Sequence, residues 1–165
     1  METITCRTLY GETKQVSVDK LVIYPGVYAI IIHEDSVLLL KSQATGKWMQ
    51  PGGGIQKGET IEQALQREML EEVGIQVAID KFAHFQADFF YYDPLDKAFQ
   101  GYLFFYYCTP LTLELQPPDP ETEEGIPYWV EINNLTAEDF ESHGEVTMHL
   151  ILGHLPSNSA KHDPD

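Results

Sequence analysis

The stretch Gly53–Ile75, GGIQKGETIEQALQREMLEEVGI, runs from a glycine-rich turn into a predicted helix that ends among charged residues. Glu68, Glu71 and Glu72 share one face of that helix, because residues three and four apart lie on the same side. The first half of the same face is apolar, with Ile61, Ala64 and Leu65. Like charges at this spacing repel by about 0.2–0.5 kcal/mol per pair, a cost that a bound cation would reverse.

Local signals define both ends of the predicted helix. Thr60 followed three residues later by Gln63 is a capping box, which fixes the helix start. Gly74 supplies the left-handed residue that commonly ends a helix. Arg67 stands four residues before Glu71, and its planar guanidinium could also reach Glu59 across the loop with two parallel hydrogen bonds. The glycines before the helix permit positive φ and close backbone approach; they are Gly52, Gly53, Gly54 and Gly58.

The density of carboxylates on this helix suits magnesium or manganese, which prefer hard oxygen ligands and bridge to substrate phosphates. Zinc would require His or Cys, and the segment contains neither. The six histidines of the chain show no paired ligand spacing near it. A solvated acidic helix face is the alternative interpretation of the same pattern.

The segment resembles the signature of the Nudix hydrolases, a MutT-like family, in which charged residues stand at fixed intervals between two glycines. Gly53 is followed after five residues by Glu59 and after seven more by the pair Arg67-Glu68. The remaining fixed positions are also filled, by Met69, Glu71, Glu72, Gly74 and Ile75. The resemblance covers these 23 residues directly, and the flanking sequence KWMQPGGG also looks like that family.

The resemblance implies a divalent-metal site and a set of catalytic residues. The implied ligands of Mg²⁺ or Mn²⁺ are Glu68, Glu71, Glu72 and the backbone carbonyl of Gly52. Arg67 would orient the carboxylates and Glu59 would support it. The base that activates water is either Glu68 or an acidic residue of a later loop, for which the candidates are Glu121, Glu123 and Glu124.

The implied reaction is hydrolysis of a pyrophosphate linkage in a nucleoside diphosphate joined to another moiety, by attack of water on phosphorus. A nucleoside triphosphate, a dinucleoside polyphosphate or a nucleotide sugar would fit that description. Positioning and charge stabilisation carry such reactions, and carboxylate-held metals provide both. Two alternatives remain open: a catalytically silent Nudix-like nucleotide sensor or adaptor, and a different acid/base enzyme such as a glycosidase, which needs two carboxyls facing each other across a cleft.

Substrate contacts are predicted at Trp48, Gly53, Gly54 and Tyr91. Aromatic side chains offer surfaces on which a base stacks, although aromatics alternating through strands are mostly core residues. A tyrosine at the distance of Tyr91 beyond the motif resembles the pattern of diadenosine polyphosphate hydrolases. The proline typical of ADP-ribose pyrophosphatases is missing at the corresponding place, since Pro94 falls several residues later.

The composition agrees with a small-molecule enzyme. A chain of 165 residues that is 43% hydrophobic is long enough for one domain with a sizeable core. Its net charge of −16 argues against nucleic-acid duplexes and anionic membranes as steady partners. The chain has neither a signal-peptide pattern nor an apolar run of membrane-spanning length, so we expect a cytoplasmic protein. A homodimer is left open, and Cys6 and Cys108 are expected to be buried thiols.

The remaining pattern predicts an α/β fold of α/β/α architecture, and the resemblance to the Nudix hydrolases implies a sandwich around a mixed β-sheet. One Nudix domain is expected over residues 1–155, followed by a disordered tail at 156–165 and interrupted by a proline- and acid-rich loop at 117–125. Predicted strands and the second helix follow from β-branched and apolar runs. They are Val27–His33 and Val37–Lys41 as a hairpin, Gln76–Tyr92 paired with Gly101–Thr109, the strand Tyr128–Ile132, and the helix Glu145–Leu152.

Overall fold

A computed structural model of the protein describes residues 1–116 and 125–155. The predicted tail and nearly all of the predicted acidic loop lie outside the described residues. The elements, in chain order, are β1 (Thr3–Thr8), β2 (Thr13–Ser17), β3 (Leu21–His33), β4 (Ser36–Lys41), β5 (Trp48–Met49), β6 (Gly52–Gly54), α1 (Ile61–Glu72), β7 (Val77–Tyr92), β8 (Lys97–Pro110), β9 (Ile126–Glu131) and α2 (Gly144–His154). Short 3₁₀ turns connect several of them.

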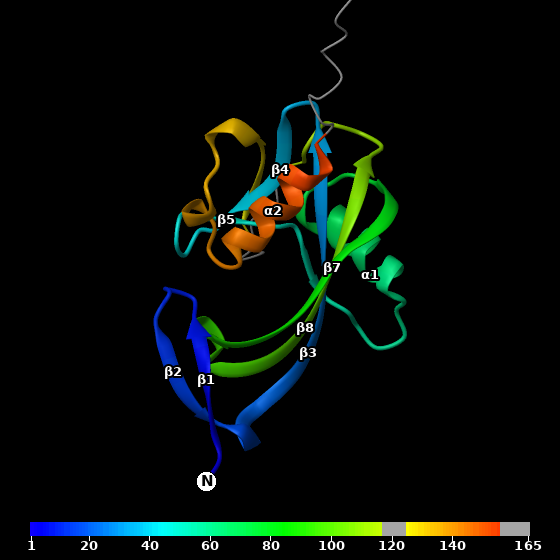
Figure 1. Ribbon diagram of the computed structural model, residues 1–165. Helices are drawn as coiled ribbons and strands as arrows, with labels where there is room; N and C mark the ends of the chain where they lie inside the picture. The colour runs from blue at the N-terminus through cyan, green and yellow to red at the C-terminus, as the bar shows by residue number, and fades with distance from the viewer. Residues whose placement is uncertain (117–124, 156–165) are drawn as a thin grey trace, which may run out of the picture.

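The strands form a mixed sheet in the order β2-β1-β7-β8-β3-β4-β5, with β6 paired to β3 and β9 paired to β4. The pairs β3/β8 and β1/β7 are parallel, and the remaining pairs are antiparallel. The long strands β3, β7 and β8 extend from the helical part of the molecule into a second, strongly curved part that β1 and β2 flank (Figure 1). The sheet is therefore curled, with the two parts joined by these three strands.

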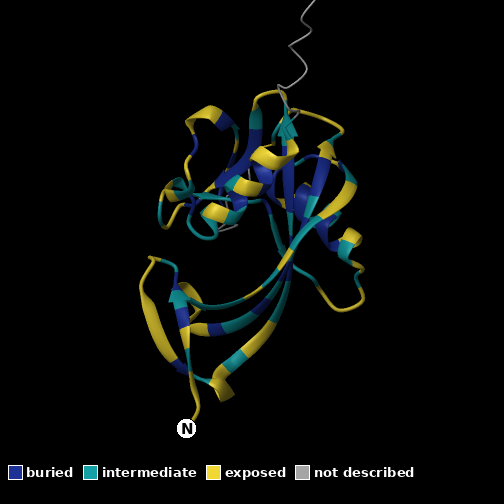
Figure 2. Cartoon of the chain, viewed as in Figure 1, coloured by how far each residue is buried: buried dark blue, intermediate teal, exposed yellow. Residues whose placement is uncertain are grey.

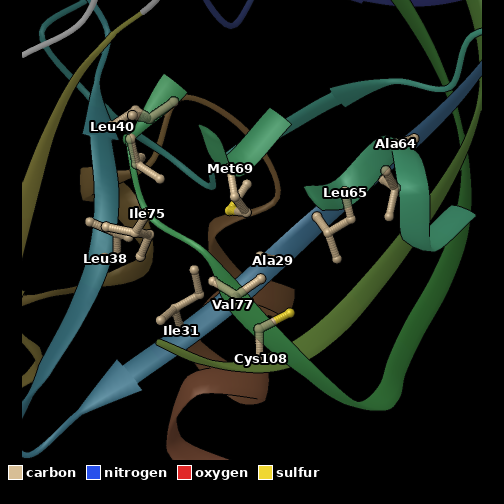
Figure 3. Packing of buried hydrophobic residues seen from close by; sticks show 12 residues of the cluster. Ala29, Ile31, Leu38, Leu40, Ala64, Leu65, Met69, Ile75, Val77 and Cys108 are labelled. Carbon is tan, nitrogen blue, oxygen red and sulfur yellow. The ribbon is translucent and has the colours of Figure 1, made fainter. Parts of the chain in front are cut away.

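One helix packs on each face of the sheet. Val27, Ala29 and Ile31 of β3 join the core cluster under α1, whereas Ile30 belongs to the cluster under α2. This division follows from the alternation of side chains along a strand. Figure 3 shows the cluster under α1, where the helix residues point toward β3 and β4. The predicted α/β/α sandwich is confirmed, and the segment 29–31 of β3 is buried on both faces.

The sequence pattern did not predict the N-terminal hairpin of β1 and β2, nor the short strands β5 and β6. The strands of the hairpin are mostly polar, and their buried apolar residues are Cys6 and Val16, which pack with Ala98 in a small separate cluster. Figure 2 shows that burial is concentrated where the helices cover the sheet and is sparser in this curved part. Both cysteines are buried free thiols, as expected.

The ends of both helices lie close to the predicted positions. Gln63 N donates to Thr60 Oγ1 at 3.1 Å and Thr60 N donates to the Gln63 side chain at 2.9 Å, so the capping box is present. Gly74 follows α1 with φ +75°. Helix α2 begins one residue before and ends two residues after the predicted Glu145–Leu152. Neither α1 nor α2 is long and apolar enough to cross a membrane, and this holds for every helix in the described ranges.

Removal of a core side chain from α1 should destabilise the domain strongly. Leu65 is fully buried, so Leu65→Ala should lower the free energy of unfolding by about 2–5 kcal/mol through lost burial and a cavity. Leu70 on the same helix is 50% exposed, and Leu70→Ala should cost less than about 0.5 kcal/mol. Urea denaturation of both variants measures the difference; equal losses would contradict the packing described for α1.

Candidate functional site

The glycine-rich turn lies directly against the carboxylates of α1. Gly52 has φ +147°, and a Cβ there would collide with the backbone carbonyl of Val27 on β3. A Cβ at Gly53 would lie 2.6 Å from Glu68 Oε1. Only glycine therefore lets β6 pair with β3 and lets the Glu68 carboxylate approach the turn at the same time.

Arg67 connects the two sides of the site. Its Nε and Nη2 donate to the two carboxylate oxygens of Glu59 at 2.6 and 3.0 Å, and Nη2 also donates to the Gly54 carbonyl at 3.0 Å. Its Nη1 donates to Glu68 Oε1 at 2.9 Å and to Glu71 Oε2 at 3.3 Å. These hydrogen bonds, above all that to Glu59, raise the pKa of Arg67, and the same bond lowers the pKa of Glu59.

The three glutamates of α1 have different surroundings. Glu68 and Glu72 are buried, with 7% and 5% of their surface exposed, whereas the Glu71 side chain is half exposed. Glu72 Oε2 accepts a hydrogen bond from Gly52 N at 2.8 Å. Burial raises the pKa of Glu68, although Arg67 opposes the shift. The predicted ligands Glu68 and Glu72 thus contact the glycine turn, whereas Glu71 is exposed to solvent.

The donors fit a hard divalent cation by their chemistry. Glu68 and Glu72 are buried carboxylates placed against the backbone of Gly53 and Gly52, and such oxygen donors are those that magnesium and manganese prefer. Burial of carboxylates is costly unless a cation compensates for it. Among the described residues, however, no group of three or more His, Cys, Asp and Glu side chains is arranged so that it could hold a metal ion.

A cleft with a volume of about 510 Å³ opens beside these carboxylates, between the two parts of the curled sheet. Gly52, Gly53, Gly54, Glu68 and Glu72 line one end of it. Aromatic side chains line its wall, namely Tyr24, Tyr28, Phe90, Tyr91, Tyr92, Phe99, Phe105 and Phe140. Polar residues complete the lining, among them Arg7, Asp88 and His143. A cleft of this size, mainly apolar with a few placed polar groups, is typical of a small-molecule site.

The other predicted site residues fall in different places. Gly53, Gly54 and Tyr91 line the cleft, and Lys14 Nζ lies 3.8 Å from the centre of the Tyr91 ring. Trp48 is absent from the residues described as lining it; its ring packs edge-on against Tyr128 at 5.8 Å. Glu121, Glu123 and Glu124 lie outside the described residues.

Several lining residues were not identified from the sequence. Arg7 belongs to the unpredicted strand β1. Asp88 and His143 are not part of any motif identified in the sequence. A usable signal was the alternation of Asp88, Phe90 and Tyr92 along β7, which places the three on one face of a strand. All three residues line the cleft.

A family model described as the NUDIX domain matches residues 23–150. The match covers more than half of the 165 residues, and the chain belongs to the Nudix family.

Curated relatives share the region of the motif. The chain is 49% identical over 49 residues to the 8-oxo-dGTP diphosphatase of Proteus vulgaris, a match that covers 27% of this chain and 44% of the relative. It is 40% identical over 63 residues to the 8-oxo-dGDP phosphatase NUDT18 of Homo sapiens, covering 36% of this chain and 20% of the relative. The chain thus spans less than half of the length of these curated relatives.

Solved structures share the fold over most of the chain. The MutT protein from Bacillus halodurans superposes with a TM-score of 0.64 and 25% identity, covering 78% of this chain and 82% of the other. An ADP-ribose pyrophosphatase from Streptococcus suis gives a TM-score of 0.59 and 20% identity, covering 79% and 90%. The second likeness shows the fold alone.

Replacement of Arg67 tests whether its planar fork matters beyond its charge. Arg67→Lys keeps the positive charge but cannot make the paired hydrogen bonds to Glu59 while also holding Glu68. Turnover of a nucleotide substrate should fall more than about tenfold, with the circular dichroism spectrum unchanged. Lys57→Arg, at an exposed position of the adjoining loop, is the control and should leave turnover unaltered. Full activity of Arg67→Lys would remove the orienting function of Arg67.

Proposed function

We propose that the protein is a divalent-metal-dependent hydrolase that cleaves a pyrophosphate linkage in a nucleoside diphosphate joined to another moiety. The observation that carries this proposal is the Arg67-held group of carboxylates at the end of an aromatic cleft. Carboxylates next to a glycine turn suit metal-bound phosphates, and the aromatic wall suits a nucleoside. The names of the curated relatives, an 8-oxo-dGTP diphosphatase and an 8-oxo-dGDP phosphatase, support the same class of substrate.

Glu68, Glu71, Glu72 and the carbonyl of Gly52 would hold Mg²⁺ or Mn²⁺. When bound, the cation would neutralise charge on the pyrophosphate oxygens. Arg67 fixes the carboxylates around it, and Glu59 fixes Arg67 through its two-bond contact. A rigid arrangement lowers the barrier because the groups are in place before charge develops in the transition state.

Glu68 is proposed as the general base that takes a proton from the attacking water. Burial raises its pKa, and a base is more effective when its pKa lies closer to the working pH. Glu68 also lines the cleft, so its carboxylate can reach a water placed against a substrate phosphate. The loop residues Glu123 and Glu124 remain the alternative source of the base.

Metal dependence is the direct test of the proposed activity. A panel of nucleoside triphosphates, dinucleoside polyphosphates, ADP-sugars and capped RNA should include a substrate that is hydrolysed in magnesium and not in EDTA. Magnesium alone should bind weakly, because this ion keeps several waters and takes one or two protein carboxylates. Calorimetry should detect tighter binding once a non-hydrolysed diphosphate is present. Substrate binding without turnover under any metal would indicate a nucleotide sensor instead.

The base assignment is tested by removing one carboxylate at a time. A positioned base contributes about 10²–10⁴-fold, so Glu68→Gln should lower kcat at least about a hundredfold with the fold intact. Glu62→Gln, an exposed position in the first turn of α1, is the control. Magnesium titration of Glu68→Gln separates loss of the base from loss of a ligand. Retention of more than about a tenth of kcat, together with a hundredfold loss in Glu123→Gln or Glu124→Gln, would assign the base to the loop.

A further inference from the structure

Three charged or polar side chains from distant segments meet in the cleft at Asp88. Arg7 Nη2 on β1 donates to Asp88 Oδ2 on β7 at 2.8 Å. His143 Nε2, directly before α2, lies 2.9 Å from the same oxygen. All three line the cleft and are largely covered, with side-chain exposures of 32% for Arg7, 21% for His143 and 16% for Asp88. None belongs to the motif that holds the carboxylates, and Arg7 lies outside the region matched by the family model.

The proton on His143 is placed by a further neighbour. Gln86 Nε2, which can only donate, lies 2.7 Å from His143 Nδ1. His143 therefore carries its proton on Nε2 and donates it to Asp88. Within the described residues, both hydrogen bonds to the Asp88 side chain end on Oδ2, so the carboxylate retains acceptor capacity at Oδ1.

The part of the cleft next to this cluster, here termed the hollow, is lined by the aromatic side chains Tyr24, Phe90 and Phe99. Gly101 of β8 stands between Tyr24 of β3 and Asp88 of β7 in the strand register, so all three face the same side. A Cβ at Gly101 would lie 3.2 Å from the Phe90 ring. The rings of Tyr24, Phe90 and Phe99 contact one another with centroids 5.2–5.8 Å apart. An aromatic surface thus adjoins the polar cluster without an intervening side chain.

The hollow is continuous with the carboxylate end of the cleft. Tyr24 lies against the glycine turn, since a Cβ at Gly54 would be 3.2 Å from its ring, and its hydroxyl is 3.2 Å from that of Tyr28. Tyr24 therefore spans the space between the turn that faces Glu68 and the cluster around Asp88. A nucleotide whose phosphates lie at the turn would place its base in the hollow.

The charge of the cluster decides what it can bind. Arg7 is neutralised by Asp88, and a free carboxylate oxygen would repel a phosphate in a protein of net charge −16. A neutral planar group with adjacent N–H donors and a neighbouring carbonyl matches a carboxylate flanked by donors. The Watson–Crick edge of guanine has that pattern, whereas adenine would set a ring-nitrogen acceptor against Asp88.

We propose that Arg7, Asp88 and His143 form the site that reads the base of the substrate and that it selects guanine-type bases over adenine. This proposal rests on the proposed hydrolysis of nucleotides. Asp88 accepts from the N–H groups of the base. Arg7 and His143 orient the Asp88 carboxylate, and Arg7, which has further N–H groups, supplies a donor for the base carbonyl. The aromatic rings of the hollow hold the face of the base.

Two variants and two substrates test the selection. The wild-type protein should hydrolyse dGTP with a kcat/KM at least about tenfold above that for dATP. Asp88→Asn replaces one acceptor by a donor, so kcat/KM for dGTP should fall at least about tenfold, mainly through KM, while dATP is unchanged or improved. His143→Asn keeps a residue that tolerates the left-handed φ of +55° there and should shift the same ratio by about threefold. Asp80→Asn, also on β7 but outside the cleft lining, is the matched control.

Calorimetry with dGMP and dAMP separates base reading from catalysis. Binding of dGMP in preference to dAMP that is lost in Asp88→Asn would support the proposal. Absence of nucleotide hydrolysis in the same preparation would overturn the proposed function but not this base preference. Equal losses for dGTP and dATP in Asp88→Asn would show that Asp88 serves the structure rather than the base and would overturn the proposal. Equal binding of the two monophosphates by the wild-type protein would overturn it as well.

Discussion

Arg67 places a positive charge among carboxylates that would otherwise repel one another, and its guanidinium contacts Glu59, Glu68 and Glu71 at distances between 2.6 and 3.3 Å. The paired contact with Glu59 fixes the plane of the guanidinium, and the bond to the Gly54 carbonyl ties α1 to the glycine turn. A point charge would balance the carboxylates but would not set their directions. The geometry of the turn, the helix and the cleft end therefore depends on this one side chain.

Arg67 lowers the pKa of both flanking carboxylates, but at Glu68 the opposite effect of burial outweighs it. The pKa of Glu59 is lowered, so Glu59 contributes stability above its unfolded pKa, and that contribution is lost as pH falls through the folded value. The pKa of Glu68 is raised by burial, so stability is lost as pH rises through its folded pKa. The fold therefore disfavours the ionised form of Glu68. A carboxylate whose ionised form is disfavoured is expected at a site that takes up a cation or a proton.

The curl of the sheet converts this local arrangement into a substrate site. Strands β3, β7 and β8 are long enough to serve two purposes: one half packs under α1 and α2, and the other half bends away to form a wall with β1. Gly101, which pairs with Tyr24 and Asp88, lets the side chains of Phe90 and Leu103 pack closely over that wall. The cleft is therefore a consequence of strand length and curvature more than of any single loop.

The sequence by itself determined the capped helix α1, the glycine turn, the approach of Arg67 to Glu59 and the sandwich of two helices around a sheet. These features arise from periodicity, capping and contacts between residues close in the chain, such as the eight positions that separate Arg67 from Glu59. The exposure of Glu71 and the placement of Trp48 against Tyr128 required the packed structure. Only the tertiary structure brought Arg7 and His143 to Asp88, across separations of 81 and 55 residues. Such contacts depend on strand register and sheet curvature, which no local pattern specifies.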